Sequence, residues 1–202
     1  MRKTNLEIKI GLFKYILLRL VGLDFRESFV NKQYYNQLLS EITMTKAMKR
    51  LYFLCLLDAK FGDGKLFEVF DDFRAYLRGP VEESIYLSRH NNKGCPLVYE
   101  DENYSIIDSR LLEDMTDELD DNLLIDADKA IFLLRGSTLK ENREKIMDLD
   151  DTGLVDISRS LSHKVWADCF YYDEFGGSIS RKLKEPEILE EEIKCFIDKV
   201  KI

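Results

Sequence analysis

One run of seven uncharged residues, Leu51 to Leu57, constrains the fold more than any other part of the sequence. It lies within residues 43–61, where apolar side chains recur at the spacing of a helix. Because the run is apolar nearly all the way round a helix, its centre has no face to turn towards water. We therefore expect a helix through the middle of the core, ended at Gly62-Asp63-Gly64 by residues free to adopt positive φ. The basic residues of the segment are expected off its apolar face: Lys46, Lys49, Arg50 and Lys60.

Helical spacing also dominates the rest of the chain and predicts a mainly α fold. Two segments stay open: residues 66–77 fit a strand, an extended loop or a short helix, and residues 97–107 fit a short hairpin or irregular chain. We expect a single helical domain over residues 41–170, an N-terminal helical extension over 1–40, and a C-terminal loop and helix over 171–202 packed on the same domain. Further helices are expected over residues 6–21, within 25–39 and through 127–134, and a last one starts at Pro186. A helix over 80–89 has Pro80 in its first turn. A helix over 138–149 is opened by a Thr138/Glu141 capping box, and one over 153–161 is capped by residues 150–152.

The composition limits which partners and surroundings suit the chain. Of its 202 residues 45% are hydrophobic, enough for a sizeable core, and 38 acidic against 30 basic residues give a net charge of −8. A surface with this balance repels nucleic acid and anionic lipid. The N-terminal apolar run is broken by Lys9, Lys14 and Arg19, unlike a signal peptide, and no uncharged apolar stretch is long enough to span a membrane. Four widely spaced cysteines without a C-x-x-C pair complete the prediction of a cytoplasmic protein.

Sequence patterns that support catalysis or cofactor binding are missing. The chain has no Gly-rich phosphate loop, no G-x-S-x-G and no H-E-x-x-H, and its two histidines are His90 and His163. We therefore expect no cofactor, no metal and no enzymatic activity.

An acidic run over residues 108–128 leaves one enzymatic alternative open. The preferred interpretation is the solvated face of a helix with an acidic start. A calcium-binding loop is excluded because the run has no central glycine. The alternative is a small hydrolase or nuclease that holds a divalent metal through carboxylates. Its candidate ligands are Asp117, Asp120, Asp121, Asp126 and Asp128.

A transcription regulator is a further alternative, based on residues 139–166, which resemble a helix–turn–helix in spacing. The cations of this segment are Lys140, Arg143, Lys145, Arg159 and Lys164. Six acidic residues in the same segment offset them, whereas a helix that reads a DNA groove presents its cations without that offset. Two helices in the core are the preferred interpretation, and nucleic acid is an unexpected partner.

Two short motifs carry a resemblance to a known family. Residues 46–53 read K-x-x-K-R-L-Y-F, and residues 73–81 read F-x-A-Y-x-x-G-P-V. A predicted helix end at Leu161-Ser162-His163 is followed by Trp166. Over residues 40–170 this arrangement resembles the Panacea domain of SocA-like antitoxins. The chain departs from the family pattern at Tyr76, where the family has Trp, at Arg50, where it has an apolar residue, and in a longer loop over 91–114.

The resemblance implies a protein that neutralises a cognate toxin by direct binding, in some members by delivery to an ATP-dependent protease. From the residues themselves, Tyr52 and Phe53 supply buried area, whereas Tyr76 and Arg78 suit either a core-and-rim arrangement or part of a partner surface. The acidic surface would select a basic patch on the toxin and speed the encounter. The candidate site residues are Lys46, Lys49, Leu51, Tyr52, Phe53, Phe73, Tyr76, Arg78, Gly79, Pro80, Val81, His163 and Trp166.

Overall fold

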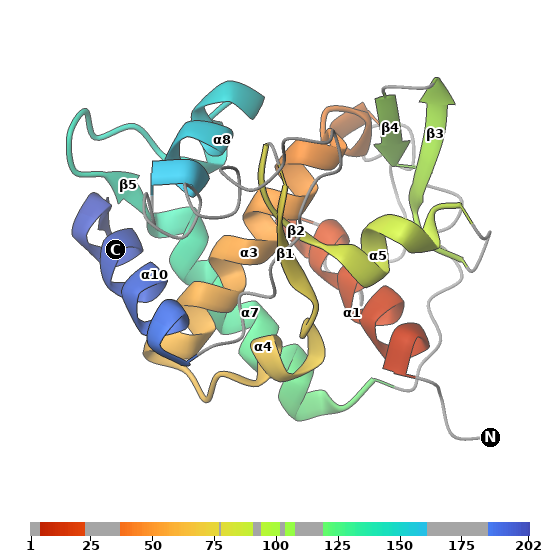
Figure 1. The fold of residues 1–202 in the computed structure, drawn as a ribbon, viewed down its shortest axis with the longest axis horizontal. Helices are drawn as coiled ribbons and strands as arrows, with labels where there is room; N and C mark the ends of the chain where they lie inside the picture. The colour runs from red at the N-terminus through yellow and green to blue at the C-terminus, as the bar shows by residue number, and fades with distance from the viewer. Residues whose placement is uncertain are drawn as a thin grey trace, which may run out of the picture.

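The computed structural model describes residues 5–22, 37–76, 78–90, 94–101, 104–107, 119–160 and 186–202. This part of the chain is mainly helical, as expected, with short antiparallel strand pairs added to the helices (Figure 1). The helices are α1 Asn5–Leu20, α3 Met44–Phe61, α4 Lys65–Val69, α5 Glu83–Ser88, α7 Asp121–Gly136, the 3₁₀ turn Ile146–Asp148, α8 Asp151–Ser160 and α10 Pro186–Lys199. The strands are β1 Phe73–Tyr76, β2 Gly79–Glu82, β3 Leu97–Asp101, β4 Tyr104–Ile107, β5 Thr138–Leu139 and β6 Val200–Lys201.

Helix α3 is the centre of the fold, which confirms the expectation from the run Leu51–Leu57. Every side chain of that run is 0% exposed. Figure 1 shows α3 across the middle of the molecule, with α1 and α5 on one side, α10 on the other and α8 above. The helix begins at the Thr43 cap, whose hydroxyl accepts the Lys46 N–H at 3.1 Å. It ends before Gly62 as expected, although the positive φ of 73° falls at Gly64 and not at Gly62.

The burial of two basic residues on α3 corrects the sequence prediction. Lys49 is 1% exposed and Arg50 is 7% exposed, although both were expected away from the core. Each side chain ends at a backbone carbonyl from elsewhere in the chain. Lys49 Nζ donates to the Pro80 oxygen, and Arg50 Nη2 donates to the Met147 oxygen. These acceptors explain how charged groups are accommodated at positions where spacing alone predicted solvent.

The region around Pro80 also differs from the prediction. Residues 66–77 divide into α4 and β1, and β1 pairs with β2 in the register Phe73↔Glu82 to Tyr76↔Gly79. Pro80 therefore lies in a strand and not in the first turn of a helix, a position open to proline because a two-stranded ladder leaves an edge. Helix α5 begins three residues later, where the Glu82 carboxylate accepts the Ile85 N–H at 2.8 Å. Leu97–Asp101 and Tyr104–Ile107 pair as the antiparallel strands β3 and β4, which agrees with the hairpin, one of the two forms that the sequence left open.

The capping box expected at Thr138 is wrong. Thr138 and Leu139 instead form β5, which pairs with β6 near the C-terminus as Thr138↔Lys201 and Leu139↔Val200. A local capping signal was overridden because a distant strand takes up the backbone groups of this segment. The chain then turns through the 3₁₀ segment into α8, whose first amides are capped by Asp150 at the N–H of Gly153, 2.8 Å away. The helix–turn–helix considered for residues 139–166 lacks its first helix, because β5 and the 3₁₀ turn Ile146–Asp148 stand where that helix was expected.

Both terminal segments contribute side chains to the same core. In α1, Leu12, Phe13, Ile16 and Leu17 are 0% exposed, and in α10 Phe196 stacks on Phe53 with ring centroids 5.1 Å apart. Helices α1 and α10 occur where periodicity predicted them, and α7 starts earlier than predicted, at Asp121. The expected helix within 25–39 lies mostly outside the described residues, and the division into domains stays a prediction. Within the described ranges, no helix has both the length and the apolar character to cross a membrane.

Candidate functional site

The two halves of the sequence motif meet inside the fold. Lys49 Nζ on α3 donates to the Pro80 oxygen on β2 at 2.6 Å. The neighbouring Gly79 has φ of 91°, a conformation that favours glycine. A Cβ at this position would lie against Ser158 Oγ of α8 and 3.1 Å from Lys49 Cε. Glycine is therefore required for α3, β2 and α8 to approach one another here.

Burial changes the acid–base behaviour of Lys49. The loss of water on burial lowers the pKa of Lys49 from its ordinary value of 10.5 to about 7. Burial therefore disfavours the charged form of this amine. Its hydrogen bond to a backbone carbonyl gives it a positioning role between α3 and β2.

The aromatic residues of the motif form one packed cluster. The rings of Tyr52 and Phe73 lie 5.1 Å apart at their centroids, and Tyr52 Oη donates to Glu192 Oε2 of α10 at 2.8 Å. Burial, the Glu192 charge and this hydrogen bond raise the pKa of Tyr52 well above its usual value. Leu51, Tyr52 and Phe53 are fully buried, and Phe73 and Val81 nearly so. These five side chains hold the fold together and have no access to a ligand in solution.

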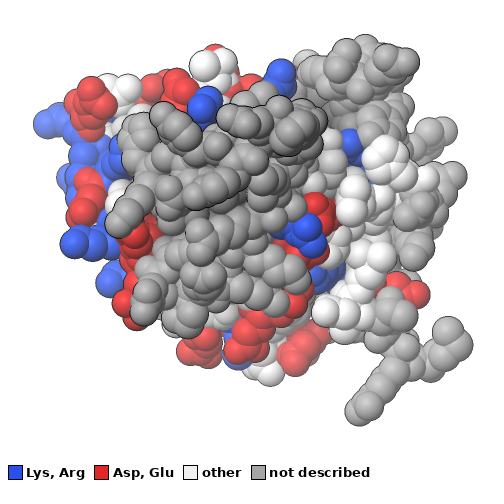
Figure 2. Space-filling model, viewed as in Figure 1, with Lys and Arg blue, Asp and Glu red and all other residues white. Residues whose placement is uncertain are grey.

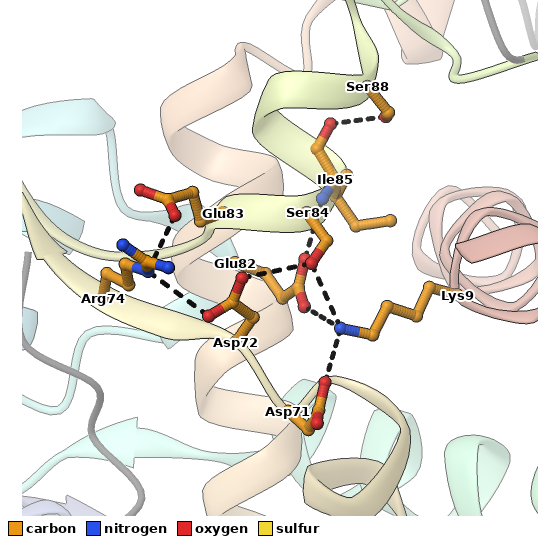
Figure 3. A network of polar contacts seen from close by, with 9 residues as sticks. All are labelled: Lys9, Asp71, Asp72, Arg74, Glu82, Glu83, Ser84, Ile85 and Ser88. Atoms are coloured by element: carbon orange, nitrogen blue, oxygen red, sulfur yellow. Dashed lines mark hydrogen bonds and ion pairs between the residues drawn. The ribbon is translucent and has the colours of Figure 1, made fainter. Parts of the chain in front are cut away.

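A buried lysine that the motif did not include joins α1 to the hairpin β1–β2 (Figure 3). Lys9 Nζ lies 2.6 Å from Glu82 Oε1, 2.7 Å from Asp71 Oδ1 and 3.3 Å from Ser84 Oγ. Glu82 is 0% exposed and also caps α5. Burial lowers the pKa of Lys9, but its hydrogen bonds and the charges of Asp71 and Glu82 outweigh burial and raise it. The pair spans 73 residues of sequence, so no local pattern could reveal it.

The network continues from Glu82 to the outer side of the hairpin. Ser84 Oγ donates to Asp72 Oδ2 at 3.2 Å, and Arg74 Nε lies 3.3 Å from Asp72 Oδ1 and 2.7 Å from Glu83 Oε2. Glu83 Oε1 in turn accepts the Tyr76 hydroxyl at 2.7 Å. Arg74, which Figure 3 shows beside Glu83, and Tyr76 are therefore held in fixed positions by one carboxylate at the start of α5.

An aromatic and arginine-rich surface covers α5 and the hairpin turn. The Tyr76 and Tyr86 rings lie 5.6 Å apart, and the Arg89 guanidinium stands 3.4 Å above the Tyr86 centroid. Leu87 is 47% exposed. In Figure 2, uncharged atoms lie beside Lys or Arg and Asp or Glu atoms in the region of α5. We call this surface the hairpin face and define it as Arg74, Tyr76, Arg78, Tyr86, Leu87 and Arg89.

The remaining candidate residues lie in three places: at the start of α3, in the turn between β1 and β2, and outside the described residues. Lys46 Nζ donates to the Glu41 oxygen at 3.2 Å at the exposed N-terminal end of α3. Arg78 is exposed in the hairpin turn. Thr43, the N-cap, also donates its hydroxyl proton to Asp151 at 2.7 Å, which joins the starts of α3 and α8. His163 and Trp166 lie outside the described residues.

The carboxylates considered as metal ligands have separate partners. Asp120 caps α7 by accepting the Asn122 N–H at 2.8 Å, whereas Asp128 pairs with Arg19 Nε at 2.8 Å. Asp126 is buried, which corrects the expectation of a fully solvated run, and lies 3.3 Å from both Lys65 Nζ and Lys129 Nζ. Asp121 is exposed in the first turn of α7, and Asp117 lies outside the described residues. Among the residues described, three or more His, Cys, Asp or Glu side chains do not gather in an arrangement that would hold a metal ion.

Comparison with family models, with curated proteins and with solved structures gave no match to this chain. The resemblance to the Panacea domain therefore stays a prediction from the motif residues.

Proposed function

We propose that this chain is an antitoxin-like protein that neutralises a cognate toxin by direct binding and catalyses no reaction of its own. The resemblance over residues 40–170 motivates the proposal. It is supported by the fact that some motif residues make contacts inside the fold while others lie at the surface. Lys49, Tyr52 and Gly79 are engaged in internal contacts, while Tyr76 and Arg78 belong to the surface.

The hairpin face is the observation that carries this proposal. Tyrosine and arginine are enriched among the residues that dominate binding energy at protein interfaces. Here Glu83 holds Tyr76 and Arg74, and Tyr86 supports Arg89, so these side chains lose little conformational entropy when a partner docks. The exposed Leu87 supplies an apolar contact in the same surface.

The partner that we propose is a protein toxin. The net charge of −8 attracts a basic toxin at long range, and the three arginines of the hairpin face suit an acidic or aromatic part of its surface at the contact itself. The three described cysteines, Cys55, Cys95 and Cys195, are free thiols, which suits the reducing cytoplasm as the place of action. Delivery of the bound toxin to an ATP-dependent protease is a second step within the same proposal. It predicts a shorter half-life of the toxin in a chase experiment when that protease is present.

Co-expression with a small toxic reading frame next to the gene tests the proposal. We expect the wild-type chain to restore growth and to retain the toxin on pull-down. Leu87→Glu is expected to lose both, because it places a charge in the hairpin face without disturbing the core. Phe61→Glu at the end of α3 is the matched control, since Phe61 is 52% exposed, close to the 47% of Leu87, and lies on another element.

Two results would count against the proposal. Toxicity that the wild-type chain does not relieve, with no complex on pull-down, rules out neutralisation by binding. Full protection by Leu87→Glu, in a chain with unchanged thermal unfolding, moves the docking site away from the hairpin face.

A further inference from the structure

The outer side of α7 carries two large apolar side chains exposed to solvent. Phe132 is 77% exposed, the highest value among the large hydrophobic residues of the described chain, and Ile125 is 51% exposed. They are seven residues apart, so they point in nearly the same direction, about 10 Å apart along the helix. Single exposed apolar side chains are common on protein surfaces, so the meaning of this pair depends on the charges arranged around it.

Helix α7 is firmly placed in the fold, so this exposure belongs to the folded chain. Its opposite side buries Leu123, Ala127, Ala130 and Leu134. Two contacts to the end of α1 fix the exposed side: Arg19 Nε lies 2.8 Å from Asp128 Oδ1, and Arg135 Nη2 donates to the Arg19 oxygen at 2.5 Å. Ile125 and Phe132 therefore stand on a rigid surface.

The charges around the apolar pair have opposite signs at the two ends of the helix. Asp121 lies four residues before Ile125, and Arg135 lies three residues after Phe132, and both are exposed. We call the set Asp121, Ile125, Asp128, Lys129, Phe132 and Arg135 the α7 seam. An antiparallel copy of the seam that sets Ile125 against Phe132 also sets Asp121 against Arg135, because both pairs are centred on residues 128–129. A parallel copy would instead oppose Asp121 to Asp121 and Arg135 to Arg135.

We propose that the α7 seam binds a second copy of this chain, as an antiparallel pair of α7 helices related by a two-fold axis. The interface is isologous, so the same residues serve on both sides. At the axis, Asp128 and Lys129 each approach their own counterpart. The charge of each is balanced by an ion pair within its own chain, Asp128 with Arg19 at 2.8 Å and Lys129 with Asp126 at 3.3 Å. This inference is independent of the proposed function.

Sedimentation equilibrium of the full chain, from micromolar concentrations to about 1 mM, tests the pairing. We expect a concentration-dependent equilibrium between monomer and dimer, since the seam is one helix wide. Phe132→Ser and Ile125→Ser are expected to raise the dissociation constant at least about tenfold, as truncation of a central interface residue does. Phe61→Ser, at another surface position with 52% exposure, is the matched control and should leave the equilibrium unchanged.

Charge exchange tests the antiparallel geometry itself. Asp121→Arg alone and Arg135→Asp alone should each weaken the homodimer, because each creates two like-charge contacts. An equimolar mixture of the two variants should associate again as a heterodimer, and so should the double variant as a homodimer. Thermal unfolding of each variant shows that the fold is intact. If Arg135→Asp unfolds the chain, the two serine variants still decide the question.

Three results would overturn the proposal. They are a monomer at every concentration, a dimer that neither serine variant weakens, and charge variants that fail to recombine although each is folded. Should the chain be a monomer and Phe132→Ser abolish protection in the co-expression experiment, the seam holds the toxin and not a second copy. Leu87→Glu, by contrast, should leave the dimer intact, so failure of the proposed function and failure of the pairing are distinguishable.

Discussion

Lys49 Nζ donates a hydrogen bond to the carbonyl oxygen of Pro80 at 2.6 Å, and this bond joins α3 to β2 in the interior. The two residues belong to the two halves of the sequence motif, 31 positions apart. The contact explains why a lysine stands at a buried position: its stem packs against the core and its amine satisfies the buried Pro80 carbonyl.

The buried amine makes stability depend on pH. Burial lowers the pKa of Lys49 to about 7, whereas its ordinary value of 10.5 applies in the unfolded chain. Between these values the unfolded chain binds more protons, so the free energy of unfolding should rise with pH, by up to about 1.4 kcal/mol per pH unit. Urea unfolding at pH 6, 7.5 and 9 should show this rise for the wild type relative to Lys49→Met. Lys60→Met, at an exposed position of α3, should follow the wild type, and a constant difference between wild type and Lys49→Met across this range would contradict the assignment.

Gly79→Ala should destabilise the fold. The positive φ of 91° alone costs about 1–2 kcal/mol for a residue with a Cβ. The added methyl would also press on Ser158 and Lys49, so the loss should exceed that figure. Gly136→Ala is the matched control, since nothing lies within 4 Å of a Cβ there and the residue ends α7. Thermal unfolding that is equal for the two variants would show that the approach of α3, β2 and α8 is looser than described.

The sequence allowed α1, α3 and α10 to be predicted because their burial follows a local period. The same logic failed where a partner came from far along the chain. Thr138 begins a pattern typical of a helix cap, yet it pairs as a strand with β6, which lies more than 60 residues further along the chain. Arg50 was placed in solvent because its acceptor, the Met147 oxygen, lies 97 residues on. In the candidate site, the motif identified Lys49, Tyr52 and Gly79, but it gave no signal for Lys9 and Glu82, whose pairing exists only in the folded chain.

Lys9→Met should be strongly destabilising. It would leave Glu82, which is 0% exposed, with the Ile85 N–H as its remaining described donor, and removal of one partner from a buried pair costs about 3–5 kcal/mol. Because the pKa of Lys9 is raised above 10.5, its contribution is fully present at neutral pH and is lost only above that value. Lys9→Met with Glu82→Gln should lose less than the sum of the single variants, measured by urea unfolding. Strict additivity of the two losses would argue against the direct contact.

Tyr52→Phe tests how α10 is attached to the core. The change removes the hydroxyl that donates to Glu192 at 2.8 Å in a fully buried site, so the loss should be about 1–3 kcal/mol. Tyr76→Phe removes the same group from a bond of 2.7 Å to Glu83 on the half-buried hairpin face, where water replaces it, and should lose less, about 0.5–1.5 kcal/mol. Hydrogen exchange should locate the first loss in α10 and the second in α5. An equal loss for the two variants, or no faster exchange in α10, would mean that the packing of Phe196 on Phe53 holds this helix without help from Tyr52.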